Sequence, residues 1–126
     1  MLRICASFLL LGMMLSCTKQ PDLAGFDLEK FVQDEAGCQD MRKEQVAWLK
    51  AHKENLKGVS SNDIEDLFGK PDIQQLADRN QEYYIYFLEK GPHCEKITNP
   101  SQSYSMAFRF SAIGLATEIT FQNGLP

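Results

Sequence analysis

The sequence is poor in the residues on which enzymes and metal sites most often depend. It contains only two histidines, His52 and His93, and it has neither a Cys-x-x-Cys nor a His-x-x-x-His pair to preorganise a metal ion. No glycine-rich phosphate-binding loop is present. Carboxylates are plentiful, but their helical spacing among polar neighbours is typical of a solvated surface. These features predict a protein without catalytic residues, a cofactor or a metal.

Positive charge is also scarce. The chain has 13 lysines and arginines against 17 aspartates and glutamates, a net charge of −4. If the first sixteen residues are removed, Arg3 leaves with them, and the net charge becomes −5. Nucleic acid is therefore excluded as a partner on electrostatic grounds. Anionic lipid is repelled in the same way, so attachment to a membrane has to come from acyl chains.

The one long apolar run stands at the start of the sequence. Residues 1–3 form a short basic segment, and residues 4–15 are apolar except for Ser7 and Gly12. This run is too short to span a bilayer as a permanent helix, and it is typical of a secretion signal. We therefore interpret residues 1–16 as a signal peptide.

The run ends in Met14-Leu15-Ser16-Cys17, which resembles the lipobox of bacterial lipoproteins. In that motif the cysteine receives a diacylglyceryl group and becomes the mature N-terminus. The resemblance implies that Cys17 is the lipid attachment site and that residues 17–25 form a lipidated, flexible tether. It also implies a location in the cell envelope, on the outer membrane facing the periplasm. The alternatives are an uncleaved anchor and an ordinary secretory signal.

Cys38 and Cys94 are the cysteines that remain once Cys5 leaves with the signal and Cys17 takes the lipid. A pair of cysteines in an exported chain predicts a disulfide, because the compartment outside the inner membrane is oxidising. The alternative is a zinc site that combines the pair with His52 and His93. His52, however, falls on an apolar stripe, which favours a partly buried side chain with satisfied hydrogen bonds.

Residues 58–72 mark the point where the chain changes from helical to extended structure. Ser60 is a good N-cap, and Gly69 followed by Pro71 ends the helix that it starts. Before this segment, the apolar spacing in residues 26–32 predicts one or two helical turns. Residues 38–57 predict a long helix with Leu49 and Leu56 on its apolar stripe. Trp48 lies beside this stripe, where it can either roof the core or face a partner.

The rest of the chain predicts strands. Residues 73–77 and 83–88 form a hairpin with a turn at 78–81, a long loop covers 91–102, and residues 104–110 alternate between apolar and polar. In the last strand, 115–121, Leu115, Thr117, Ile119 and Phe121 share one face. We therefore expect an α+β fold, in which N-terminal helices pack on one face of a three- to four-stranded antiparallel meander. Residues 26–126 form its single domain.

This order of elements resembles the BamE/SmpA (OmlA) lipoproteins over residues 57–121. The resemblance is carried by Gly58-Val59-Ser60, by Ile64 to Asp72, by Tyr84-Ile85-Tyr86 and by Phe110 to Leu115. It implies a small two-helix, three-strand domain in the machinery that inserts β-barrels into the outer membrane. The same unit is similar to the repeats of β-lactamase inhibitor proteins. The helical arm before Gly58 and the Cys38/Cys94 pair depart from the family pattern.

Together these features predict a non-catalytic, lipid-anchored adaptor that binds another envelope protein. The alternative is an envelope inhibitor or ligand-binding module. Surface aromatic residues are the expected anchors for a partner, which makes Trp48, Tyr83 and Tyr84 the candidate binding residues. Which of the two tyrosines points away from the helices depends on strand register.

Overall fold

The computed structural model describes residues 19–126, so the predicted signal peptide and Cys17 lie outside the described residues. Helical segments come first and strands second, apart from one 3₁₀ turn between the second and third strands. The elements in chain order are α1 (Leu28–Gln33), η1 (Glu35–Gly37), η2 (Lys43–Gln45), α2 (Val46–His52), η3 (Lys53–Leu56), α3 (Ser61–Phe68), β1 (Ile73–Leu76), β2 (Glu82–Phe87), η4 (Pro92–Cys94), β3 (Tyr104–Phe110) and β4 (Ala116–Asn123).

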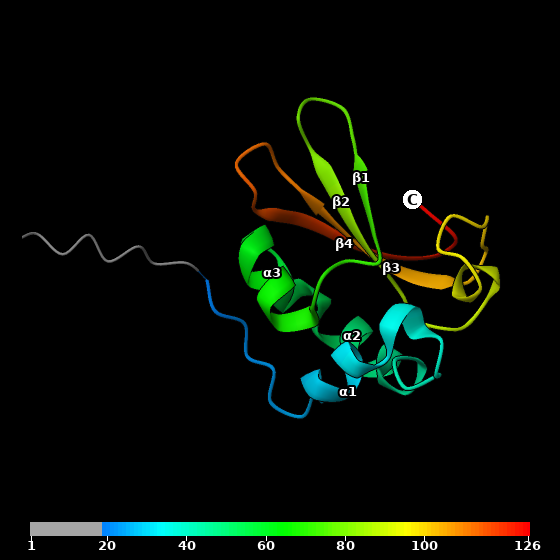
Figure 1. Cartoon of the computed structure of the whole chain (residues 1–126). Coiled ribbons are helices and arrows are strands. Elements are labelled where there is room, and N and C mark those ends of the chain that lie inside the picture. The colour runs from blue at the N-terminus through cyan, green and yellow to red at the C-terminus, as the bar shows by residue number, and fades with distance from the viewer. Residues whose placement is uncertain (1–18) are drawn as a thin grey trace, which may run out of the picture.

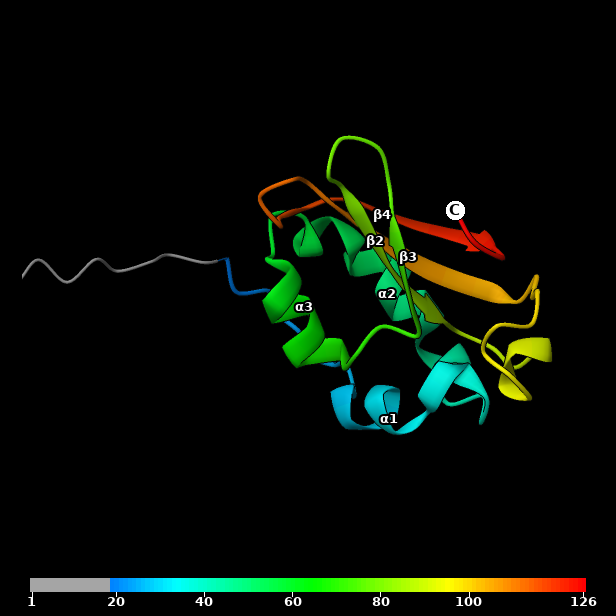
Figure 2. The same ribbon diagram turned by 45° about the horizontal axis from the view of Figure 1, so that its top comes forward.

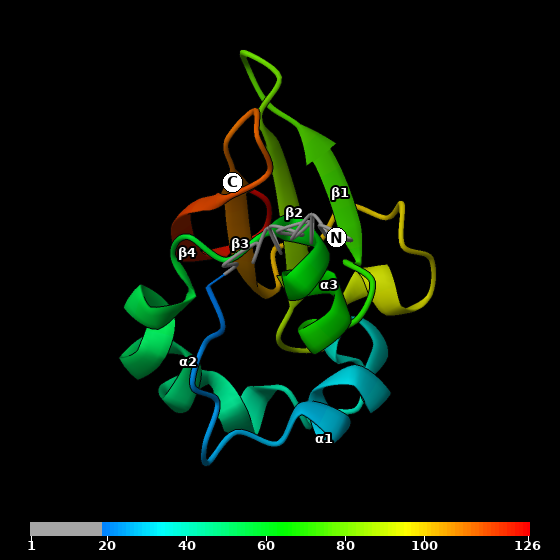
Figure 3. The ribbon, with the colours of Figure 1, turned by 90° about the vertical axis from the view of Figure 1, so that its left-hand side faces the viewer.

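The molecule has two layers, as predicted for an α+β fold. The four strands pair in the order β1-β2-β3-β4, each antiparallel to its neighbour. The helices lie together on one face of this sheet (Figures 1 and 2). The β1–β2 turn and the β3–β4 connection lie at the same end of the sheet (Figure 3).

An aromatic cluster fills the space between the layers. Phe31 of α1 and Phe68 of α3 are both fully buried, and their ring centroids are 5.3 Å apart. Phe68 also meets Phe108 of β3 at 5.6 Å, and Tyr86 of β2 lies 5.8 Å from Phe31. Large buried rings dominate the stability of a small core, so this cluster fixes the helices on the sheet.

The helix predicted at the centre of the chain forms as expected. The Ser60 hydroxyl accepts a hydrogen bond from the Asp63 backbone N–H at 3.1 Å, which caps α3. Gly69 follows the helix with φ of 82°, a conformation that side chains disfavour, and Pro71 then leads into β1. Ile64 and Phe68, on the inner side of α3, are fully buried.

The prediction of one long helix over residues 38–57 is wrong. This region is divided into a turn, two 3₁₀ segments and the short helix α2. The Asp34 carboxylate accepts hydrogen bonds from the backbone N–H groups of Gln39 and Arg42, at 2.7 and 2.9 Å. A continuous helix over residues 38–57 would use the Arg42 N–H for the Cys38 carbonyl. Ala36 and Asp40 also have positive φ, which interrupts the helix before α2 begins.

The last strand differs from the predicted alternation. The pairing of β3 with β4 shifts between Arg109 and Phe110, so Phe110 pairs with Ala116 and Arg109 with Glu118. Thr117 is the extra residue of this irregularity and is exposed, whereas Ala116 is buried in the core. Leu115 and Thr117 therefore do not share the core face with Ile119.

Candidate functional site

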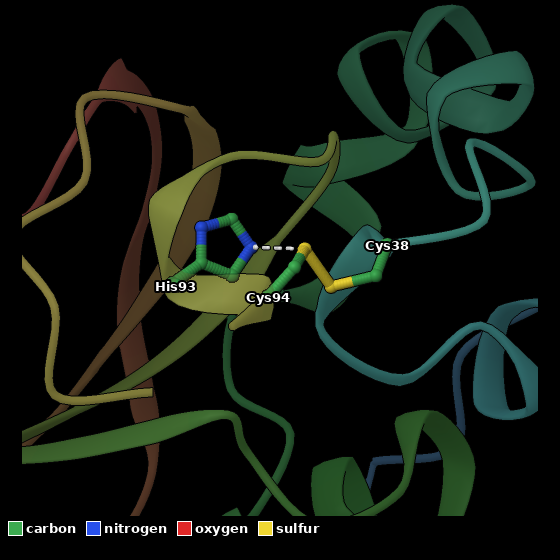
Figure 4. Close-up of side chains that lie close together, drawn as sticks. All are labelled: Cys38, His93 and Cys94. Carbon is green, nitrogen blue, oxygen red and sulfur yellow. Dashed lines mark hydrogen bonds between the residues drawn. A yellow bond between two sulfur atoms is a disulfide. The ribbon is translucent and has the colours of Figure 1, made fainter. Parts of the chain in front are cut away.

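The predicted disulfide is present. Cys38, in the turn after η1, is bonded to Cys94 at the end of η4, and their Cα atoms are 5.8 Å apart (Figure 4). The bond joins segments separated by 56 residues. It links the helical layer to the loop between β2 and β3, which covers part of the sheet face turned away from the helices.

His93 lies beside the disulfide and is almost completely buried. Its ring is stacked on Phe87 of β2, with centroids 3.8 Å apart. Its Nε2 lies 2.8 Å from the Ala36 carbonyl oxygen, and the Cys94 Sγ lies 3.6 Å from the same Nε2. A carbonyl oxygen only accepts, so Nε2 donates its N–H to Ala36. His93 therefore bridges the same two segments that the disulfide joins.

The other ring nitrogen of His93 meets a chain of hydroxyl groups. Nδ1 lies 2.8 Å from the Ser101 Oγ, and the Ser101 and Ser103 hydroxyl oxygens are 3.1 Å apart. The Ser103 hydroxyl donates in turn to the Lys90 carbonyl at 2.9 Å. These contacts hold the loop between β2 and β3 closed on itself.

Of the four residues in the alternative zinc site, three lie together and His52 does not. Cys38, His93 and Cys94 lie together, with their ligand atoms within 4.8 Å of one another. His52 is elsewhere: its ring is stacked on Trp48 with centroids 4.0 Å apart, and its Nδ1 donates to the Trp48 carbonyl at 2.8 Å. His52 is thus partly buried and hydrogen-bonded, as expected from its place on the apolar stripe.

The turn that carries Cys38 is held by contacts other than the disulfide. Asp34, which is fully buried, fixes it from within by accepting from Gln39 and Arg42. Gly37 has φ of 68°, and a Cβ added there would lie 2.8 Å from the Phe87 carbonyl oxygen and the Glu89 nitrogen. Only glycine permits this approach to β2.

Arg42 and Asp72 add a buried ion pair to the same turn. Their side chains meet at 2.7 Å, and the Arg42 guanidinium also donates to the carbonyls of Phe31 and Phe87, at 2.9 and 3.0 Å. Burial raises the pKa of Asp72 above its ordinary value, although Arg42 and the Phe87 N–H both favour the charged carboxylate. Sequence reasoning missed this pair, because nothing in the local pattern distinguishes Arg42 from solvated neighbours.

The disulfide borders an open cavity of about 620 Å³. Cys38, His93 and Cys94 line it together with Arg42 and the carboxyl-bearing residues Glu35 and Glu95. Cys94 is exposed, so a small molecule in solvent can reach the sulfur atoms.

The strand register settles which tyrosine points away from the helices. Tyr84 lies on the helix face, 6% exposed, with its ring 4.7 Å from that of Phe110. Tyr83 lies on the outer face, opposite Arg109 of β3. The Arg109 guanidinium is 5.6 Å from the Tyr83 ring, and its Nε donates to the Gln81 side chain at 2.7 Å. Tyr83 is the predicted binding residue that is available to a partner.

The outer face also carries an apolar groove of about 620 Å³, toward the end of β2 opposite to Tyr83. Its apolar lining comes from Ile73 of β1, from Phe87 of β2, and from Ile97, Pro100 and Leu125. Ile97 and Leu125 are large hydrophobic residues that remain more than two-fifths exposed. Exposed apolar surface of this kind is typical of binding sites.

Trp48 takes the first of its two predicted roles. Its indole is partly buried and stacked on Phe26, with centroids 4.7 Å apart, and it packs against the core. It therefore roofs the core between α2 and the start of α1, and its other stacking partner is His52. This leaves Tyr83 as the better placed aromatic anchor.

Comparison with known proteins yields no matching family model, and no match among curated proteins or solved structures. The resemblance to the BamE/SmpA lipoproteins therefore stays a prediction. Within residues 19–126, no helix has both the length and the apolar character needed to cross a membrane.

Proposed function

We propose that this protein is a non-catalytic, lipid-anchored adaptor of the cell envelope, which binds another envelope protein through the outer face of its sheet. The observation that carries the proposal is the outward position of Tyr83 beside Arg109, on the same sheet face as the apolar groove. Tyrosine and arginine are the residue types that most often dominate binding energy at interfaces. A membrane tether raises the effective concentration of such a surface near its partner.

A link to the assembly of outer-membrane proteins is part of the proposal. It is supported by the resemblance over residues 57–121. In that range a short capped helix is followed directly by an antiparallel meander, which has four strands where the resemblance implies three. The membrane partner is reached through the lipid on Cys17, and the protein partner is held at the periplasmic face of the outer membrane.

Pull-down from the membrane fraction in mild detergent tests the adaptor role. Tyr83→Ala should abolish co-purification of a β-barrel or barrel-assembly protein, because it removes the central aromatic anchor. Leu76→Ser is the matched control, since Leu76 is 83% exposed on the neighbouring strand β1 but lies on the helix side of the sheet. Equal loss of the partner in both variants, or in neither, would contradict the proposal.

The groove favours a second candidate function, a ligand-binding or inhibitory module of the envelope. Its lining is mainly apolar. Asp72, Asn99 and Gln102 add a few polar groups that can orient a ligand. Co-purification of a soluble enzyme or a small molecule, lost in Leu125→Ser and retained in Tyr83→Ala, would favour this function over the adaptor.

A further inference from the structure

We propose that Cys38, Cys94 and His93 form a redox-gated Zn²⁺ site, which is closed while the disulfide is intact and opens when a dithiol reduces it. This inference goes beyond the adaptor role and does not depend on it. It rests on three features of the disulfide region: the distance between the ligand atoms, the contacts that hold both segments, and the hydroxyl chain behind His93.

The ligand atoms already lie close to a coordinating arrangement (Figure 4). The Cys94 Sγ and the His93 Nε2 are 3.6 Å apart, and all three ligand atoms lie within 4.8 Å of one another. Zinc bonds of roughly 2.3 Å to sulfur and 2.0 Å to nitrogen require sulfur and nitrogen atoms about 3.5 Å apart in a tetrahedral site. Once the covalent bond is broken, the two sulfur atoms have to separate, and the Ala36 carbonyl oxygen, 2.8 Å from Nε2, has to make room for the metal.

Both segments are held in place without the disulfide. The turn around Cys38 is fixed by Asp34 and by the Arg42–Asp72 ion pair, while the Asn99 side chain donates to the Pro92 carbonyl across the base of the other loop. The thiols therefore stay near each other after reduction, which lowers the entropy cost of binding a metal.

The hydroxyl chain suits a metal-bound His93. A histidine that ligates through Nε2 must carry its proton on Nδ1 and donate it to a second group. The Ser101 hydroxyl donates to Ser103, and Ser103 donates to the Lys90 carbonyl, so the Ser101 oxygen can accept the Nδ1–H. Ligation replaces the hydrogen bond from Nε2 to Ala36, so the Ala36 carbonyl has to turn away from Nε2 to admit the metal.

The reaction balances as two steps. A dithiol gives two electrons and two protons, the Cys38–Cys94 bond breaks to two thiols, and the dithiol becomes a disulfide. Zn²⁺ then displaces the two thiol protons to solvent and forms two Zn–S bonds and one Zn–N bond. Water from the adjoining cavity takes the fourth coordination position. The dithiol and Zn²⁺ reach the sulfur atoms through the same cavity.

The experiment uses the full chain with Cys5 and Cys17 changed to serine, so that Cys38 and Cys94 are its only thiols. The protein is reduced with a dithiol, freed of it under argon and titrated with Co²⁺ as a spectroscopic probe. We expect one equivalent to give tetrahedral absorption bands and sulfur-to-cobalt charge transfer, both removed by Zn²⁺. His93→Gln should weaken binding at least tenfold, and the control His52→Gln should leave it unchanged. The oxidised protein should bind none.

A thermal measurement covers the case in which reduction loosens the fold. Zinc that binds the native state raises the melting temperature of the reduced protein, and His93→Gln should remove most of that rise. Reduced protein with no cobalt bands and no zinc-dependent rise would overturn the proposal, and the disulfide would then be purely structural. Bands of equal strength in His93→Gln would overturn it as well.

Discussion

Arg42 and Asp72 form an ion pair, buried between the turn after α1 and the start of β1, with side chains 3% and 9% exposed. The pair connects the helical layer to the sheet edge, because Asp72 also accepts from the Phe87 N–H of β2 at 2.8 Å. Removing one partner of such a pair leaves the other charge buried without compensation. We therefore predict that Arg42→Ala lowers the free energy of unfolding by about 3–5 kcal/mol, measured by urea denaturation.

The control for this variant is the exposed ion pair between Lys90 and Asp40, whose charged atoms are 3.5 Å apart. Lys90→Ala should cost less than about 1 kcal/mol, because solvent screens an exposed pair. If both variants lowered the free energy of unfolding by the same small amount, the Arg42–Asp72 contact would not be holding the turn to the sheet.

The titration of Asp72 gives a second prediction. Burial raises the pKa of Asp72, so folding favours its protonated form relative to the unfolded chain, where the pKa is about 3.9. The stabilisation linked to this group is fully present below that value and is lost as the pH rises through the pKa of the folded state. Carboxyl-carbon NMR should give a pKa above 3.9 in the folded protein. A lower value would mean that Arg42 outweighs burial.

The disulfide supports a prediction on stability that is separate from metal binding. Closing a 56-residue separation restricts the unfolded chain, which on the chain-entropy model contributes about 4 kcal/mol to the free energy of unfolding. The double variant Cys38→Ser/Cys94→Ser should show this loss in urea, measured against a Cys17→Ser background. Alkylation of the unreduced, denatured protein should label neither Cys38 nor Cys94, and label at both would refute the bond.

Much of this fold follows from local signals in the sequence. The Ser60 cap, the Gly69 stop and the alternation in β3 act over a few residues, so each could be predicted without knowledge of tertiary contacts. The Cys38–Cys94 pair followed from elimination among four cysteines.

What the sequence could not supply depends on long-range contacts. The break of the predicted long helix comes from the Asp34 side chain, which takes the Arg42 N–H that a helix would use internally. The burial of Arg42 depends on Asp72, thirty residues away. The outward position of Tyr83 needed the register of β2 against β3, because a one-residue slip exchanges the two faces of a strand.

Lipid attachment at Cys17 is a prediction from the sequence alone. Cys17→Ala should leave a precursor that keeps its signal segment and takes up no fatty acid, because the thiol that accepts the diacylglyceryl group is gone. Metabolic labelling with a fatty acid, followed by mass measurement, detects both effects. Changing Cys5 to alanine serves as the control and should leave labelling intact. Normal labelling of the Cys17 variant would refute the lipobox interpretation.

The last prediction compares the adjacent tyrosines of β2, which differ in little except the face they occupy. Tyr84 is 6% exposed and packs edge-to-face on Phe110, so Tyr84→Ala should lower the free energy of unfolding by about 3 kcal/mol. Tyr83 is partly exposed and contacts Arg109 on the outer face, so Tyr83→Ala should cost about 1 kcal/mol or less. Urea denaturation of the two variants measures the difference. The reverse order would mean that β2 is shifted by one residue, and Tyr84 would then be the residue presented to a partner.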